Sequence, residues 1–377
     1  MKKTALLVFS AVLVAIATGC NKENASEVTF AGIEVEVGEQ NGSFSKLYIL
    51  NEGAFPGAST LDLLDFKNKK YCTDIFAQAN PEVAQGLGNT GNDMAIADGK
   101  LWVLLNASNQ VAVLHLPDAK LEKVIEVESP RFIVNEGKYA YITSYAGAVY
   151  GSEDMVPGKV YRIDRTSYAV STVEVGYQPE GLAVLNGKLY VANSGGYNPT
   201  PDNRISVINL DTFKLEKQIE APMRNLYQLA ATKDKIWVSS YGEWDAQWTL
   251  IAPHTLVSMT PSGQFTQWDG VHSDKMSLCG NTLVCVGNDA EMSGGYDNCI
   301  YFVNTTGTSF QKVSFNGSDF SRIGYPYAVL MNESNNDIYI ADASFTGGSK
   351  VVCFDGKSLK HKWTVNTGVG TGHLLLQ

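Results

Sequence analysis

Polar and aromatic residues recur directly after short β-like runs, and they are the residues in this chain best suited to chemistry. Amide side chains both donate and accept hydrogen bonds, and aromatic faces cover apolar area. Gathered on one surface, such side chains suit a large, mostly uncharged ligand with many amide or hydroxyl groups. The residues that we predict to bind such a ligand are Asn106, Arg131, Tyr145, Asn193, Tyr197, Arg224, Tyr241 and Trp244.

Each of these residues also has a structural interpretation. Asn at the end of a strand is a common turn residue, and an aromatic side chain in a loop often packs on its own loop. The prediction of a binding surface therefore depends on the clustering of the whole set rather than on any single member.

The elements that would position these residues belong to a repeat. A short strand recurs with spacings of roughly 40 to 55 residues, a period expected of propellers. The clearest copy, residues 178–221, contains four strands, which is the content of one blade. Hairpin signals such as Asn186-Gly187 precede several copies. The copies of the second strand are residues 47–50, 101–104, 140–143, 189–192, 236–239, 283–286 and 338–341.

Seven copies predict an all-β fold, a single seven-bladed β-propeller. The first copy lacks an obvious first strand, whereas residues 370–377 are similar to the first strands of other copies. We therefore expect the C-terminal strand to complete the first blade, a closure that removes exposed sheet edges. The predicted organisation is a signal peptide over residues 1–19, a lipidated N-terminus and tether over 20–45, and the propeller over 46–377. Residues 33–37 alternate in polarity and are expected to add locally to a sheet.

The loops are asymmetric. Loops between first and second strands, and between third and fourth strands, are short. Loops between second and third strands are long in most copies and share a face with the links between blades. Rigid scaffolds carry function on such loops, so we place the binding surface on the long-loop face.

Metal-dependent hydrolysis or lactone cleavage is the enzymatic alternative on this face. Hard cations favour oxygen ligands, but hydrolysis also needs a positioned acid or base. The chain has no Gly-x-Ser-x-Gly, His-Glu-x-x-His or P-loop motif. We therefore expect a binding protein rather than an enzyme, with no cofactor and no resident metal. The oxygen ligands that the hydrolase alternative would use are Glu52, Asn106, Asn193, Asp289 and Asp342.

The N-terminus has the features of an export signal. Lys2 and Lys3 precede an apolar run, which ends in small residues before Cys20. That run is too short to span a bilayer as a mature helix. The sequence around Cys20 resembles a bacterial lipobox, which implies that Cys20 becomes the lipidated mature N-terminus. The alternative is an ordinary secretory signal with an incidental cysteine.

The net charge bears on the kind of partner, and the cysteine count bears on disulfide bonds. The chain has 29 basic and 39 acidic residues, a formal net charge of −10, and such a surface repels nucleic acid. Without Cys20 five cysteines remain, and an odd number argues against a complete disulfide framework. They fit small buried hydrophobes, although Cys279 and Cys285 flank a tight turn where one cross-strand disulfide would also be consistent with the sequence.

The strand and loop Leu47-Tyr-Ile-Leu-Asn-Glu-Gly53, the repeated Leu-Tyr-Val-Ala-Asn strand and the lipoprotein signal together resemble the YncE-like β-propellers found as surface lipoproteins in Bacteroides-type bacteria. Within that group the chain is similar to the BtuG-type corrinoid-binding proteins. The resemblance implies a lipid-anchored, surface-exposed protein of the outer membrane. It would capture vitamin B12 (cobalamin) and deliver it to a TonB-dependent transporter of the BtuB type. A glycan, a haem-like ring or a protein partner are the alternative ligands, and a structural or adhesive role is the alternative function.

Overall fold

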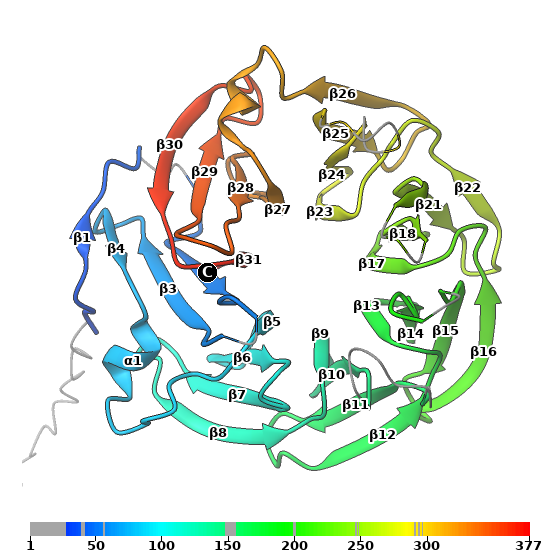
Figure 1. The fold of residues 1–377 in the computed structure, drawn as a ribbon. Helices are drawn as coiled ribbons and strands as arrows, with labels where there is room; N and C mark the ends of the chain where they lie inside the picture. Colours follow the sequence, from blue (N-terminus) through cyan, green and yellow to red (C-terminus); the bar gives the residue numbers. More distant parts are fainter. Residues whose placement is uncertain are drawn as a thin grey trace, which may run out of the picture.

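Seven antiparallel sheets surround a central channel in the computed structural model, which is viewed along the channel in Figure 1. The structure describes residues 28–38, 42–55, 57–147, 156–198, 201–245, 247, 249–289, 292, 295 and 297–377. The predicted seven-bladed propeller is therefore confirmed. The predicted signal peptide and Cys20 lie outside the described residues. Within the described part of the chain, neither helix has the length and apolar character needed to cross a bilayer.

Each blade has four strands, ordered from the channel outward. Blade 1 consists of β31 (Thr371–Leu376), β2 (Lys46–Asn51), β3 (Thr60–Asp65) and β4 (Lys70–Cys72), with β1 (Ile33–Glu34) added outside. Blades 2 to 4 consist of β5 (Gly91–Ala97), β6 (Lys100–Leu105), β7 (Gln110–His115), β8 (Leu121–Glu126); β9 (Pro130–Glu136), β10 (Tyr139–Ser144), β11 (Lys159–Asp164), β12 (Val170–Glu174); and β13 (Pro179–Leu185), β14 (Lys188–Asn193), β15 (Arg204–Asn209), β16 (Lys214–Glu220).

Blades 5 to 7 follow the same order. They consist of β17 (Leu226–Ala231), β18 (Ile236–Ser240), β21 (Thr255–Met259), β22 (Phe265–Gln267); β23 (Lys275–Cys279), β24 (Thr282–Asn288), β25 (Asn298–Asn304), β26 (Phe310–Ser314); and β27 (Pro326–Met331), β28 (Ile338–Asp342), β29 (Lys350–Phe354), β30 (His361–Asn366). A hairpin of β19 (Glu243–Trp244) and β20 (Leu250–Ala252) extends the loop after β18. The helices α1 (Ile75–Ala79) and η2 (Asp319–Arg322) lie in links between blades.

The core lies between the blades rather than inside any one of them. Six clusters of buried apolar residues each draw on two neighbouring blades, and a seventh, between blades 3 and 4, also includes Tyr227 of blade 5. One position of the second strand is aromatic in six blades, and its side chain is almost fully buried each time. These residues are Tyr48, Trp102, Tyr141, Tyr190, Trp237 and Tyr339. Strands buried on both faces read as nearly continuous apolar runs, which is why the second strand is the repeat most easily found in the sequence.

The C-terminal strand closes the ring, as the sequence predicts. β31 pairs antiparallel with β2, with Leu375 opposite Tyr48 and Leu374 opposite Ile49. A buried polar network fixes the end of this pairing, because the Thr371 hydroxyl donates to the Asn51 side chain at 2.5 Å. Asn51 in turn donates to Asp62 at 2.6 Å. Closure therefore includes hydrogen bonds that hold β31, β2 and β3 in one register.

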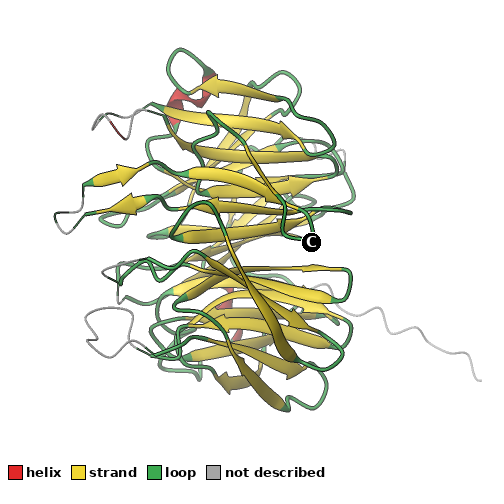
Figure 2. Ribbon diagram, turned by 90° about the vertical axis from the view of Figure 1, so that its right-hand side faces the viewer, coloured by secondary structure: helices red, strands yellow, loops and turns green. Residues whose placement is uncertain are grey.

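Two further sequence expectations concern the N-terminal segment and the cysteines. Ile33 and Glu34 of β1 pair with β4, so the alternating tether segment does add a strand to blade 1. The five described cysteines are free. Cys285 lies opposite Met276 and Cys279 lies opposite Thr282, so no disulfide joins Cys279 and Cys285. Figure 2 shows the strands running between two faces, where the loops gather.

We expect closure by β31 to account for much of the stability. Deleting residues 370–377 should lower the urea midpoint sharply and broaden the transition, because β2 would become an open edge. The milder change Thr371→Val should cost about 1–3 kcal/mol, because it leaves the buried Asn51 oxygen without its donor. Urea unfolding followed by tryptophan fluorescence measures both, with the exposed Thr166→Val as the matched control. An unchanged midpoint after the deletion would show that β31 contributes nothing.

Candidate ligand-binding site

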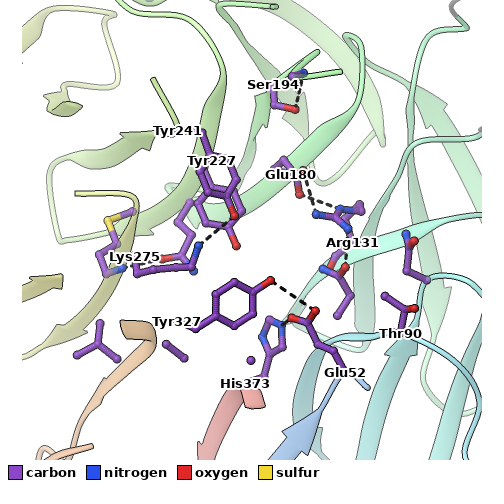
Figure 3. Close-up of a pocket in the computed structure, with 18 of the residues that line it drawn as sticks. Glu52, Thr90, Arg131, Glu180, Ser194, Tyr227, Tyr241, Lys275, Tyr327 and His373 are labelled. Atoms are coloured by element: carbon purple, nitrogen blue, oxygen red, sulfur yellow. Dashed lines mark hydrogen bonds and ion pairs between the residues drawn. The ribbon is translucent and has the colours of Figure 1, made fainter. Parts of the chain in front are cut away.

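A pocket of about 730 Å³ opens at one mouth of the central channel, and all seven blades line it. Its walls combine the links that enter the first strands with the loops that leave the second strands, so it lies on the long-loop face. Figure 3 shows the side chains that converge inside it. A volume of this size matches pockets that enclose a drug-sized ligand or an equivalent part of a larger one.

One backbone hydrogen bond, repeated from blade to blade, positions this lining. In six blades the N–H of the residue after the second strand donates to a carbonyl at or before the start of the first strand, at 2.8 to 3.2 Å. The donors are Glu52, Asn106, Tyr145, Ser194, Tyr241 and Ala343. The first five line the pocket, because the bond holds the end of the second strand beside the channel.

A buried ion pair crosses from blade 3 to blade 4. Arg131 donates to both oxygens of Glu180, at 2.9 and 3.1 Å, and to the Asn92 side chain at 2.5 Å. The Tyr145 hydroxyl also donates to Glu180, and the guanidinium lies 4.9 Å from the centre of the Tyr145 ring. Burial alone would lower the pKa of Arg131, but the Glu180 carboxylate and the Tyr145 oxygen raise it well above its usual value. Arg131 therefore keeps its positive charge and has the Glu180 carboxyl as its main partner.

A second cation lies across the channel, enclosed by tyrosines. The ammonium of Lys275 is 4.5, 4.6 and 5.1 Å from the ring centres of Tyr227, Tyr241 and Tyr327. It donates to the Tyr241 hydroxyl at 3.0 Å and to Asp274 at 2.9 Å. Burial would lower the pKa of Lys275, but Asp274 and the oxygens of Tyr227 and Tyr325 raise it above the usual value, so the charge persists.

Two carboxyl groups flank a buried histidine near blade 1. His373 Nε2 is 3.9 Å from Glu52 Oε1, and Nδ1 is 3.6 Å from Asp93 Oδ1. Burial raises the pKa of Glu52 to about 7, against the opposing effects of Arg131, the Tyr327 hydroxyl and Lys275. Burial also raises the pKa of Asp93 to about 7. Burial, together with Lys275 and Arg131, lowers the pKa of His373 to about 3, so its ring is neutral at pH 7.

The outer edge of the pocket is apolar. Five large aromatic side chains line it while remaining 37 to 60 % exposed, and we call them the aromatic crown. They are Phe55, Tyr197, Trp244, Tyr325 and Phe345. Exposed apolar patches of this kind mark interaction surfaces. The pocket therefore changes from aromatic at its rim to charged and phenolic in its depth.

The structure brings together six of the eight residues predicted to bind ligand: Asn106, Arg131, Tyr145, Tyr197, Tyr241 and Trp244. Asn193 lies elsewhere, fully buried at the end of β14, where it donates to Arg204 O and Ser206. The next residue, Ser194, follows the strand and is the one that lines the pocket. Arg224 donates to Pro201 O and lines a separate small pocket beside the β19–β20 hairpin.

Three further pocket residues, Tyr227, Lys275 and Tyr327, are absent from the residues that the sequence analysis selects. A signal for two of them exists, because Arg131, Glu180, Tyr227 and Tyr327 are each the second residue of a first strand. Aligning the repeats on first strands would have found both tyrosines. Lys275 begins its strand instead, and its orientation toward the channel follows only from the fold.

Most pocket amides hold the loops together. Asn106 donates to Pro130 O, Asn92 to Arg131 O and Asn225 to Gly242 O. The structural interpretation of strand-end asparagines therefore applies to these donors. The groups left to meet a ligand in the depth of the pocket are chiefly phenols, the Lys275 ammonium and the Glu52 carboxyl.

The oxygen ligands of the hydrolase alternative are not all in one place. Glu52 and Asn106 line the pocket, whereas Asn193, Asp289 and Asp342 do not. Asp289 lies within 4.8 Å of Asp297 and Cys299, a grouping with ligand atoms close enough for a metal ion among the described residues. However, Asp289 is already paired with Lys312 and accepts from Tyr301.

Comparison with known proteins agrees with the fold. No protein-family model matches the chain, and no curated protein matches it. Among solved structures it is similar to hydrazine synthase of Kuenenia stuttgartiensis, with 14 % identity, a TM-score of 0.57, and coverage of 74 % of this chain and 87 % of that chain. It is also similar to apo AztD of Citrobacter koseri, with 10 % identity, a TM-score of 0.54 and coverage of 88 % and 97 %. The WD40 propeller domain of Doa1 gives 10 % identity, a TM-score of 0.54 and coverage of 82 % and 92 %. Identities this low show the β-propeller fold alone.

The raised pKa of Glu52 has a consequence for stability. A carboxyl whose pKa is higher in the folded than in the unfolded state takes up protons on folding, so its contribution to stability is lost as pH rises from about 4.5 to about 7. Glu52→Gln keeps an acceptor for Tyr327 and should stabilise the protein by on the order of 2 kcal/mol at pH 8, and little below pH 5.

Urea titrations at pH 5, 6, 7 and 8 measure this effect. The exposed Glu136→Gln, on the far end of β9, is the matched control and should leave the pH profile unchanged. A difference between Glu52→Gln and wild type that is constant over this range would contradict the assignment.

Proposed function

We propose that the protein captures a corrinoid, vitamin B12, in this pocket and passes it to a TonB-dependent outer-membrane transporter. The observation that supports the proposal best is the pocket itself, in which an exposed aromatic crown surrounds a buried polar interior. A corrinoid has a broad ring edged with amide side chains and carries an appended base. Its apolar surfaces suit the crown, and its amides suit phenols and charged groups that donate and accept hydrogen bonds.

The proposed role is binding without chemical turnover. The protein would be held at the cell surface by lipid on Cys20, so that the transporter receives its ligand from a neighbour in the same membrane. The resemblance of the repeated strand and the N-terminal signal to surface-lipoprotein propellers supports this location. Burial of apolar area contributes about 25 cal/mol per Å², from which the costs of ordering are subtracted.

Calorimetry with cyanocobalamin on a soluble form that begins after Cys20 tests the ligand. We expect binding well below micromolar Kd, and about 10-fold or greater weakening for Trp244→Ala or Tyr241→Ala, because truncating a large aromatic side chain that covers the ligand costs more than about 1 kcal/mol. Phe310→Ala is the matched control for Trp244, because the two side chains are equally exposed, at 37 %, and Phe310 lies on an outermost strand.

Two outcomes would redirect this proposal. Absence of binding at micromolar concentrations would reject the corrinoid. Hydrolysis of a lactone or ester that is lost with EDTA would favour the enzymatic alternative instead.

The location is tested separately. Cys20→Ser should abolish lipidation and move the protein from the membrane to the soluble fraction, because the apolar leader is the chain's predicted export signal and Cys20 its predicted lipid attachment site. Protease added to intact cells should remove the wild-type protein from the surface. Cleavage only after lysis would place the protein on the periplasmic side and reject surface exposure.

A further inference from the structure

The pocket contains one strong hydrogen-bond donor that the protein does not fully use. Lys275 has three N–H groups, and its acceptors among the described residues are Tyr241 and Asp274. Its side chain is only 6 % exposed. The rings of Tyr227, Tyr241 and Tyr327 surround the ammonium and hold it in place. One N–H therefore remains for an acceptor that enters the pocket.

The other cation in the pocket, Arg131, is held in a bidentate ion pair. Arg131 is already bonded twice to Glu180 and once to Asn92. Two blades from Lys275, on the other side of Tyr327, blade 1 contributes a glycine where most other blades place a side chain. Gly372 has no side chain, and a Cβ there would lie 2.3 Å from Glu52 Oε1. Glu52 therefore occupies the place of an inner-strand side chain, beside the Tyr327 hydroxyl at 3.4 Å.

The aromatic crown and the charged interior of the pocket favour different features in a ligand. Any body broad enough to cover the aromatic crown excludes water from Lys275 and Glu52 beneath it. Removing water from the third N–H of Lys275 without supplying an acceptor is unfavourable, even though Tyr241 and Asp274 accept from the other two. A purely apolar plate would therefore bind poorly, whereas a molecule that carries an acceptor on a narrow arm would satisfy both levels.

We infer that the ligand is held at two levels, with its broad body on the aromatic crown and an arm carrying an anionic oxygen in the channel, where Lys275 donates to that oxygen. This inference rests on the proposed function and identifies the arm as the nucleotide arm of a complete corrinoid, with its phosphodiester as the acceptor. Lys275 then determines the preference for complete corrinoids over corrinoids that lack the arm. The macrocycle itself contacts only the aromatic crown, which both kinds of corrinoid can cover.

Comparing two probes tests this inference without any variant. Cyanocobalamin has the nucleotide arm, whereas dicyanocobinamide has the macrocycle and its amides but no nucleotide. Wild type should bind cyanocobalamin about 10- to 100-fold more tightly, the range expected of a buried hydrogen bond to a charged group. Competition calorimetry measures both Kd values on the same preparation.

Three variants test which level of the pocket produces the preference for cyanocobalamin. Lys275→Met keeps the length of the side chain and should bring the affinity for cyanocobalamin down to that for dicyanocobinamide, with the latter little changed. Lys275→Met/Asp274→Asn removes the unpaired carboxylate and should give the same result if the single variant folds poorly. Trp244→Ala, in the crown, should weaken both probes by the same factor.

The outcomes distinguish this inference from the proposed function. Equal affinity of wild type for the two probes, or equal weakening of both by Lys275→Met, would overturn the two-level scheme and leave corrinoid binding intact. Failure of both probes to bind would reject the proposed function and this inference with it.

Discussion

Each blade must hold the end of its second strand beside the start of its first strand, and a single N–H to carbonyl hydrogen bond does this in six blades. The carbonyl residue is left-handed in five of them, with φ between 41° and 65° at Thr90, Ser129, Gln178, Asn225 and Gly370. Only one of these is glycine, although the left-handed region is unfavourable for a β-branched residue such as Thr90. The scaffold imposes this conformation in these five blades, and strain of this kind gathers at binding sites.

This constraint also explains how charged side chains come to lie in the channel. The start of each first strand is fixed, so its second residue faces its counterparts in the neighbouring blades. Arg131 meets Glu180 in this way, and Asn92 joins them. Balanced pairs reduce the cost of burial, since an isolated ion would be expensive there. The pocket is consequently polar in its depth without a large net charge.

The fold could be predicted from the sequence further than the site could. The second strands are buried on both faces, so their apolar runs stand out, and closure by the last strand follows from a missing first strand. The site depends on finer information. Asn193 and Ser194 are adjacent, yet only Ser194 lines the pocket, because the Asn193 amide is hydrogen-bonded to Arg204 and Ser206 of the next strand. Lys275 follows an aspartate and looks like an ordinary surface residue until the tyrosines of blades 5 and 7 are brought around it.

Ring closure makes the pocket a product of the whole chain. Asn51 and Thr371 are 320 residues apart, yet their hydrogen bond fixes the strand that carries His373 and Gly372 into the channel. Pairings this distant in sequence form late, because their loop-closure entropy is paid before they contribute. Without β31 paired to β2, the chain has neither a finished first blade nor the pocket residues that β31 supplies. Assembly of the pocket is therefore coupled to a pairing between the two ends of the propeller domain.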